Sequence, residues 1–183
     1  FLSFKELLES ILVIEEKEID ICQFNYWFQR HQQATGLKDA HKVFEEFGGV
    51  ITGMNIDSPY LARNEYLKLG VKQSIFLGEE RQKIYDLFEK YLQFLKEEKI
   101  ADLNIESYKR IRKVTALYDF VIIDETQDLT NIQLHLIMSC LKDKRQFILC
   151  GDSNQIVHPN FFSWSKVKSM FYTTDMQGSE IHI

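Results

Sequence analysis

The pattern of hydrophobic and polar positions along this chain changes character near residue 115. Before that point apolar residues recur every three or four positions, which is the spacing of amphipathic helices. After it, short apolar runs at 120–123 and 147–150 flank a helical stretch at about 131–142, which predicts a β-α-β unit. The clearest helix runs from 79 to 98 and has one apolar face, made of Ile84, Leu87, Phe88, Tyr91 and Leu95.

Local signals predict where two of the helices begin or end. Thr130 is followed three positions later by Gln133, the pattern of a capping box at the start of the helix in the β-α-β unit. A helical pattern over 37–47 is followed by Gly48 and Gly49. We expect that helix to end there, because glycine is the favoured residue just past a helix end.

The change of period predicts two bodies with a boundary at about residues 108–117. The first is helical, from about residue 15 to 110. The second is an incomplete parallel sheet with flanking helices, whose two strands lie side by side or one strand apart. The fold class is therefore predicted to be α/β, and both strands are expected to be buried because they are continuous apolar runs.

Composition narrows the class of protein. The chain has 183 residues, of which 45% are hydrophobic, so it can bury a sizeable core. No apolar run approaches the roughly 20 residues that a membrane span needs, so no membrane partner is expected. Because the chain begins with Phe1 rather than Met, we interpret it as a piece of a longer protein. Cys22, Cys140 and Cys150 have no metal-type spacing, and the last two lie in apolar contexts, so buried reduced thiols and an intracellular location are predicted.

The net charge of −5 is unevenly distributed. Residues 63–113 carry 12 basic and 9 acidic side chains, whereas the segments on either side are acidic. A dense basic cluster suits either an ordinary solvated helix face or a contact with nucleic-acid phosphates, and composition favours the first. The cluster consists of Lys109, Arg110, Arg112 and Lys113.

Acidic and amide side chains follow each predicted strand directly. Asp124 and Glu125 come after the first strand, and Asp152 and Gln155 come after the second. Parallel strands joined by a crossover helix end at the same sheet edge, which is where open α/β folds bind ligands. A carboxylate there can hold Mg²⁺ while its neighbour activates a water molecule. Acids that merely end a strand at the solvent edge are the simpler interpretation.

The two clusters resemble known motifs. The run 121–128, VIIDETQD, resembles motif II (DExQD) of the UvrD/Rep/PcrA-like superfamily 1 helicases, and the run 151–155, GDSNQ, resembles their motif III (GDxxQ). The resemblance covers nearly the whole chain. It implies that residues 1–14 are a tail segment of the 1A ATPase core, 15–110 the helical 1B insertion, and 111–183 a partial 1A core with a RecA-like P-loop NTPase fold.

The resemblance also implies a role for each motif residue. Asp124, in the position of the Walker B acid, would coordinate Mg²⁺, and Glu125 would activate the water that attacks ATP. Gln127 would couple the nucleotide state to neighbouring motifs. Gln155 would sense the γ-phosphate, and Asp152 would help to link the ATP site to the DNA groove.

The implied partners are single-stranded or partly duplex DNA and the rest of the helicase chain, namely its P-loop segment and second RecA-like domain. Trp164 follows motif III, where the family often places an aromatic that stacks on a base, and the basic cluster would contact phosphates. Motif III departs from the family pattern at 156–158, so the lining of the DNA groove differs. No glycine in the chain is followed by Lys-Ser/Thr, so the chain has no P-loop and is not expected to hydrolyse ATP alone.

Two other functions remain open from the sequence. The chain could belong to a degenerate helicase-like module that acts as a scaffold or interaction domain, an alternative that the altered motif III favours and the intact Asp124–Glu125 pair opposes. A Mg²⁺-dependent phosphohydrolase or nuclease using Asp124, Glu125 and Asp152 is weaker, because such sites usually draw ligands from several strands.

Overall fold

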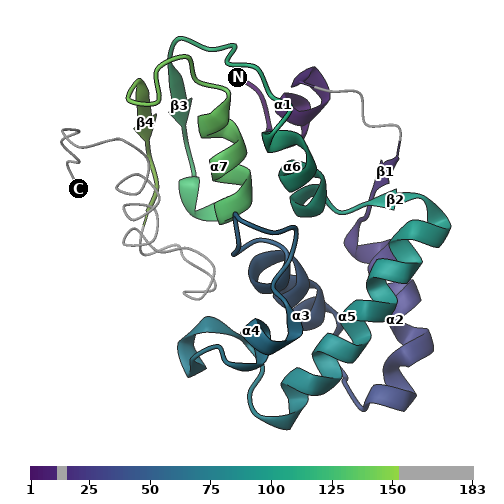
Figure 1. The fold of residues 1–183 in the computed structure, drawn as a ribbon. Coiled ribbons are helices and arrows are strands. Elements are labelled where there is room, and N and C mark those ends of the chain that lie inside the picture. The colour runs from purple at the N-terminus through teal and green to yellow at the C-terminus, as the bar shows by residue number, and fades with distance from the viewer. Residues whose placement is uncertain (12–15, 153–183) are drawn as a thin grey trace.

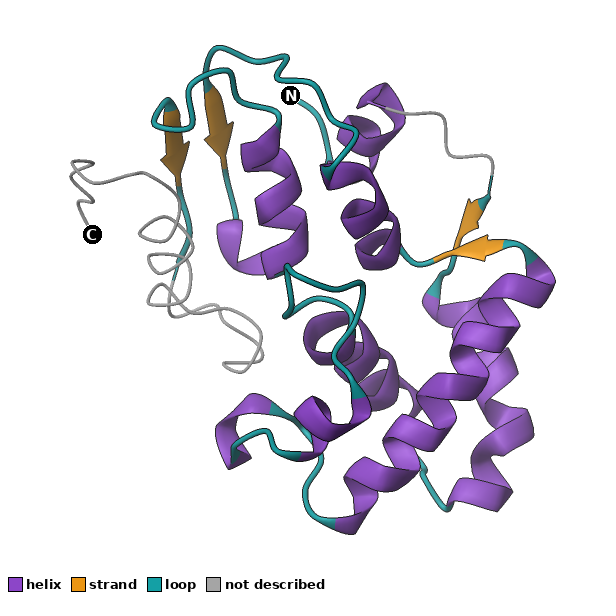
Figure 2. Ribbon diagram, viewed as in Figure 1, coloured by secondary structure: helices purple, strands orange, loops and turns teal. Residues whose placement is uncertain are grey.

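The structure is a computed structural model that describes residues 1–11 and 16–152. It is an α/β chain dominated by helices, with two small parallel sheets of two strands each (Figure 2). The described side chains form two separate hydrophobic clusters, one among the helices of the first part of the chain and one beneath the second sheet. None of the described helices is both long and apolar enough to span a membrane.

Helices fill most of the first part of the chain, as the period predicted. They are α2 (Ile21–Thr35), α3 (Ala40–Glu45), α4 (Arg63–Leu67) and α5 (Glu79–Glu98), with a short 3₁₀ turn at Val71–Gln73 (Figure 1). Their core is aromatic: Phe24, Phe47, Phe88 and Tyr91 are almost completely buried and pack ring against ring. The apolar face of α5 supplies much of this core, because its buried residues repeat with the helical period.

The predicted helix end at Gly48 and Gly49 is wrong. Beyond α3 the chain continues as a π-helix, Glu46–Ile51, which passes through both glycines before it ends at Thr52. A π-helix forms hydrogen bonds to the residue five positions back, and here the Thr52 N–H donates to the Phe47 carbonyl at 2.9 Å. Glycine is favoured just past helix ends but does not require one, and in this fold the side chain of Asn104, distant in sequence, donates to the Gly48 carbonyl within the π-helix.

Strand structure also occurs in the part that the sequence predicted to be wholly helical. β1 (Lys17–Glu18) pairs in parallel with β2 (Ile100–Ala101), the short segment that follows α5. The pairing is only two residues long, which is too short for an alternating hydrophobic pattern to predict these strands from the sequence. It joins the start of the helical part to the segment that leads out of it (Figure 1).

The second sheet confirms the predicted β-α-β unit. β3 (Val121–Ile123) and β4 (Phe147–Leu149) are adjacent and parallel, in register from Val121 opposite Phe147. The crossover helix α7 (Asn131–Ser139) covers one face, and α1 (Phe4–Ile11) packs into the same cluster. Helix α6 (Leu103–Ile111) lies beside α7 (Figure 1).

The expectation that both strands are buried is wrong for the described part of the chain. Ile123 is buried against α7, but its neighbour Ile122 is 64% exposed and Ile148 opposite it is 48% exposed. Successive side chains of a strand point to opposite faces, and among the described residues helices cover one face only. Of the cysteines predicted to be buried, Cys140 is, whereas Cys150 at the open end of β4 is exposed.

The proposed boundaries 1–14, 15–110 and 111–183 remain predictions. α1 contributes Leu7 to the cluster beneath the second sheet, although more than 90 residues of chain lie between α1 and α6.

Candidate nucleotide site at the sheet edge

The two predicted motifs emerge at the same edge of the second sheet. Because β3 and β4 run in parallel, Asp124 directly after β3 and Asp152 three residues after β4 both lie at the carboxyl end of their strands. Asp124 and Glu125 are exposed, and the Asp124 carboxylate accepts a hydrogen bond from the Glu125 N–H at 3.0 Å. This edge is the predicted position for ligand binding in a parallel sheet.

Hydrogen bonds of Thr126 connect the carboxyl ends of β3 and β4. Its N–H and its hydroxyl both donate to the Cys150 carbonyl, at 2.9 and 2.7 Å, and the Cys150 N–H donates to the Ile123 carbonyl at 2.7 Å. Thr126 is completely buried although it stands between exposed acids. Sequence reasoning missed this residue; the available signal was a short hydroxyl side chain inside an otherwise charged run directly after a strand.

Glu125 has a strained backbone. Its φ of 49° and ψ of 43° place it in the left-handed region, where Lys99 is the other non-glycine residue among those described. A non-glycine residue pays roughly 1 kcal/mol or more for this conformation, and such residues cluster at functional sites. The left-handed turn leads straight into a 3₁₀ turn, Thr126–Asp128, closed by the Asp128 N–H donating to the Glu125 carbonyl at 2.9 Å.

Gln127 connects the two motifs through its side-chain amide. The amide nitrogen donates to the Glu125 carboxylate at 2.5 Å, and the amide oxygen accepts from the Asp152 N–H at 3.2 Å. The side chain of one residue therefore touches both the acid that follows β3 and the backbone that follows β4. If the loop after β3 or the loop after β4 moves, one of the two hydrogen bonds of the Gln127 side chain changes.

The acids at this edge fit a magnesium ion that is bound together with a nucleotide. Among residues 1–11 and 16–152, no group of three or more His, Cys, Asp or Glu side chains is placed to hold a metal ion. Mg²⁺ in nucleotide-hydrolysing sites keeps several waters and takes one or two protein carboxylates together with the phosphates. Asp124 offers one such exposed carboxylate, with Glu125 next to it.

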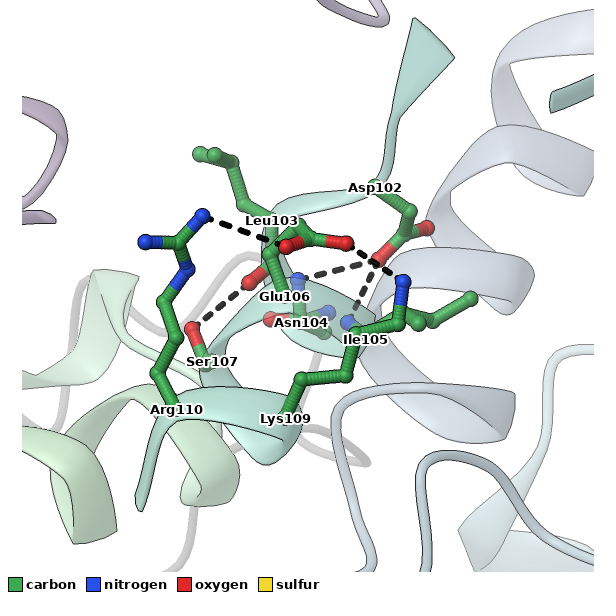
Figure 3. A network of polar contacts seen from close by, with 8 residues as sticks. All are labelled: Asp102, Leu103, Asn104, Ile105, Glu106, Ser107, Lys109 and Arg110. Carbon is green, nitrogen blue, oxygen red and sulfur yellow. Dashed lines mark hydrogen bonds and ion pairs between the residues drawn. The ribbon is translucent and has the colours of Figure 1, made fainter. Parts of the chain in front are cut away.

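The predicted basic cluster divides into two kinds of residue. Figure 3 shows Glu106 of α6 between Arg110 and Lys109, with ion-pair distances of 3.3 and 2.6 Å. Arg110 is only 9% exposed, so its charge is directed inward at Glu106. Arg112 and Lys113, just past the end of α6, are exposed to solvent.

Two predicted site residues, Gln155 and Trp164, lie outside the described residues. The structure therefore brings together Asp124, Glu125, Gln127 and Asp152, and it places the basic cluster on a separate helix, α6.

Comparison with known protein families identifies the family of the chain. The family described as the UvrD/REP helicase N-terminal domain matches residues 10–164, most of the chain, and the chain belongs to that family. A human protein, TPR and ankyrin repeat-containing protein 1, is 30% identical over 119 residues. That match covers 61% of this chain and only 4% of the human protein's length. No solved structure matches the chain.

Proposed function

We propose that this chain forms part of an ATP-dependent DNA helicase or translocase motor, in which it supplies the Walker B acids and the segment that couples them to motif III. The contact that carries the proposal is the Gln127 side chain, which touches the Glu125 carboxylate and the Asp152 backbone at one sheet edge. Membership of the helicase family provides the class of reaction.

Each acid has a distinct task in the proposed site. Asp124 would hold Mg²⁺, which neutralises charge on the phosphates when it is bound. Glu125 would orient and deprotonate the attacking water. Its backbone is in the strained left-handed conformation directly after the strand, as residues at functional sites often are. Gln127 would report the state of the site to the loop after β4, and Gln155 would contact the γ-phosphate.

The uncovered parts of the second sheet support the presence of further core elements in the working motor. Parallel sheets are normally covered by helices on both faces, yet the face that carries Ile122 and Ile148 is exposed among the described residues. We propose that the sheet belongs to a RecA-like P-loop NTPase core and that the P-loop segment and a second RecA-like domain complete the site. The grip on ATP would come mainly from that P-loop.

Contacts with DNA would involve Arg112 and Lys113, two exposed members of the basic cluster that lie outside the Glu106 ion pairs, together with Trp164. Lys109 and Arg110 share one carboxylate, which reduces their net charge toward a phosphate. Binding through such side chains releases counterions and therefore weakens as salt rises.

Replacing Glu125 by Gln in the full-length protein tests the proposed function. Gln keeps the size of Glu but cannot take a proton. We therefore expect steady-state ATP hydrolysis to fall by about 100-fold or more, as for the loss of a general base. The affinity for ATP should stay within about threefold, because the P-loop provides most of the binding. ATPase rate and ATP affinity are the measurements. Glu98→Gln, an exposed glutamate at the end of α5, is the matched control.

An unchanged ATPase rate in the Glu125→Gln protein would remove Glu125 from the reaction. If neither the wild-type protein nor the variant binds or hydrolyses ATP, the scaffold alternative replaces the motor. That alternative draws on the human relative, whose name describes a protein with TPR and ankyrin repeats.

A further inference from the structure

Asn104, at the start of α6, joins three elements that are far apart in the sequence. It is 5% exposed, and its side chain makes four hydrogen bonds. The amide nitrogen donates to the Gly48 carbonyl at 2.7 Å and to the Thr52 hydroxyl at 3.1 Å. The amide oxygen accepts from the Thr130 hydroxyl at 2.8 Å and from the Gln133 amide nitrogen at 2.9 Å.

These four bonds use the whole capacity of an asparagine amide, which has two donors and two acceptor positions. The Gly48 carbonyl can only accept, so the Asn104 nitrogen must face it and the oxygen must face α7. The Gln133 amide is oriented in the same way, because its oxygen accepts from the Thr130 N–H at 3.2 Å and its nitrogen is left for Asn104. Backbone groups at both ends therefore determine the direction of the chain of hydrogen bonds.

The π-helix makes the Gly48 carbonyl available to Asn104. In an α-helix the Thr52 N–H would donate to Gly48, four residues back, but here it donates to Phe47, five residues back. The Thr52 hydroxyl also donates to the Phe47 carbonyl, at 3.0 Å, and accepts from Asn104. The wider helical turn thus presents both Asn104 acceptors at the same place.

The segment after the π-helix also binds the first turn of α7. The Gly53 carbonyl accepts from the Ile132 N–H at 3.2 Å, and the Met54 carbonyl accepts from the Asn131 side chain at 3.1 Å. The first N–H groups of a helix have no partner within the helix, so the Gly53 carbonyl caps one of them from outside α7, while the Met54 carbonyl binds a side chain of the same turn. In Figure 1 the loop between the π-helix and α4 reaches the end of α7 where that helix begins.

The first turn of α7 follows motif II with almost no intervening chain. Only Leu129 separates Asp128 from the capping residue Thr130, and the Leu129 N–H closes the 3₁₀ turn on the Thr126 carbonyl at 3.2 Å. A displacement of the α7 cap is therefore transmitted directly to the turn that carries Glu125 and Gln127.

We propose that Asn104 is a positioning residue for Glu125 and Gln127, acting through the capping box of α7 to couple the helical part of the chain to motif II. This inference rests on the proposed ATP-hydrolysing function. It assigns Asn104 no contact with ATP, Mg²⁺ or water. Its role is to fix the position of the α7 cap relative to the π-helix, and thereby the position of the turn that carries Glu125 and Gln127.

Two substitutions break opposite sides of the Asn104 network. Asn104→Asp keeps the shape and the two acceptor positions toward α7, but it sets a carboxylate oxygen against the Gly48 carbonyl. Gln133→Glu keeps the oxygen that accepts from the Thr130 N–H, so the capping box survives, but it removes the donor to Asn104. Gln73→Glu is the matched control, because Gln73 accepts from the Gly70 N–H in the same local way, away from α7.

The variants are compared in the full-length protein by ATP kinetics and by amide hydrogen exchange. We expect kcat for ATP to fall by roughly 10-fold or more in both network variants, since small misplacements of a catalytic group are costly. KM for ATP should stay within about twofold, because the phosphate grip lies elsewhere. Exchange in the peptide that contains the first turn of α7 should accelerate by about tenfold, as expected for one lost hydrogen bond. The Gln73→Glu control should change neither measurement.

The outcomes separate this inference from the proposed function. If Glu125→Gln abolishes hydrolysis while Gln133→Glu leaves both kcat and exchange unchanged, the motor stands and the role of Asn104 is refuted. A variant with faster exchange but wild-type kcat also refutes it, since the network would then be structural only. Should Asn104→Asp fail to fold, the milder Gln133→Glu variant still decides the question. If the wild-type protein has no ATPase activity, the proposed function itself fails.

Discussion

Gly53 lies where the π-helix, α6 and α7 meet, and it has no room for a side chain. A Cβ atom added there would lie 2.3 Å from the Gly48 carbonyl oxygen, 2.7 Å from the Thr130 methyl carbon and 2.9 Å from the Thr130 Cβ. The first of these atoms belongs to the backbone of a buried helix and cannot swing away. Gly53→Ala must therefore push the π-helix and the α7 cap apart.

The expected cost follows from these contacts. Overpacking of a buried site by one carbon costs about 1–3 kcal/mol, and the separation also strains the bond from the Ile132 N–H to the Gly53 carbonyl, worth about 1 kcal/mol. Alanine also lowers the conformational entropy of the unfolded chain, which stabilises the folded state by about 0.4–1 kcal/mol. We expect a net loss of about 1–3.5 kcal/mol of unfolding free energy, which corresponds to roughly 2–14 °C in Tm for a chain of this size.

Gly48→Ala is the matched control within the same π-helix. A Cβ at Gly48 meets no heavy atom within 4 Å, so alanine fits without a clash. Alanine also restricts the unfolded chain and favours helix, and the substitution should stabilise the protein by about 0.5–1 kcal/mol. Urea unfolding and thermal melting of the wild type and both variants measure the difference.

The reasoning would be refuted by either of two results. Gly53→Ala could leave the unfolding free energy within about 0.5 kcal/mol of the wild type, the range of an unremarkable surface substitution. Alternatively, Gly48→Ala could be as destabilising as Gly53→Ala, which would mean that any side chain in this helix is harmful and that the close approach of Gly53 to Thr130 is irrelevant.

Two further substitutions test the buried polar groups. Burial raises the pKa of Asp102 above its ordinary value of 3.8, so the stability it contributes is complete below that value and is lost as pH rises through the raised pKa. Asp102→Asn keeps the cap of α6 and a hydrogen bond with the Tyr91 hydroxyl, so its stability relative to wild type should improve as the pH rises above about 4. A stability difference in urea unfolding that stays constant over pH would contradict this. Thr126→Val removes the hydroxyl bond to the Cys150 carbonyl and should cost about 1–2 kcal/mol in the same assay. The loss should exceed that of Thr35→Val at the partly buried end of α2, and equal losses would show that the bond between the ends of β3 and β4 adds nothing to stability.

Local sequence signals predicted the elements whose cause is local. The helix at 79–98 was predicted with its observed bounds, because its apolar face repeats over many turns. Thr130 and Gln133 do form a capping box, because both partners lie within one turn. The acids after β3 could be recognised because strand, turn and motif are contiguous.

Signals of this kind failed where the deciding contact was distant. Gly48 looked like a helix end, but the fold brings Asn104, 56 residues away, onto its carbonyl. Thr126 was not singled out from the sequence, because its partner Cys150 is 24 residues away. Arg110 looked like a surface charge, and it became buried because α6 packs beside α7 and Glu106 lies one turn back.

The sequence by itself determined the helical period, the β-α-β unit and the chemical character of the candidate site, since each depends on neighbours along the chain. The tertiary structure alone decided that Gln127 reaches the loop after β4 and that Asn104 connects the π-helix to the cap of α7. The physical reason is that a hydrogen bond depends on position and direction in space. Those are set only when α6, α7 and the π-helix have packed together, and no pattern of residue types specifies them beforehand.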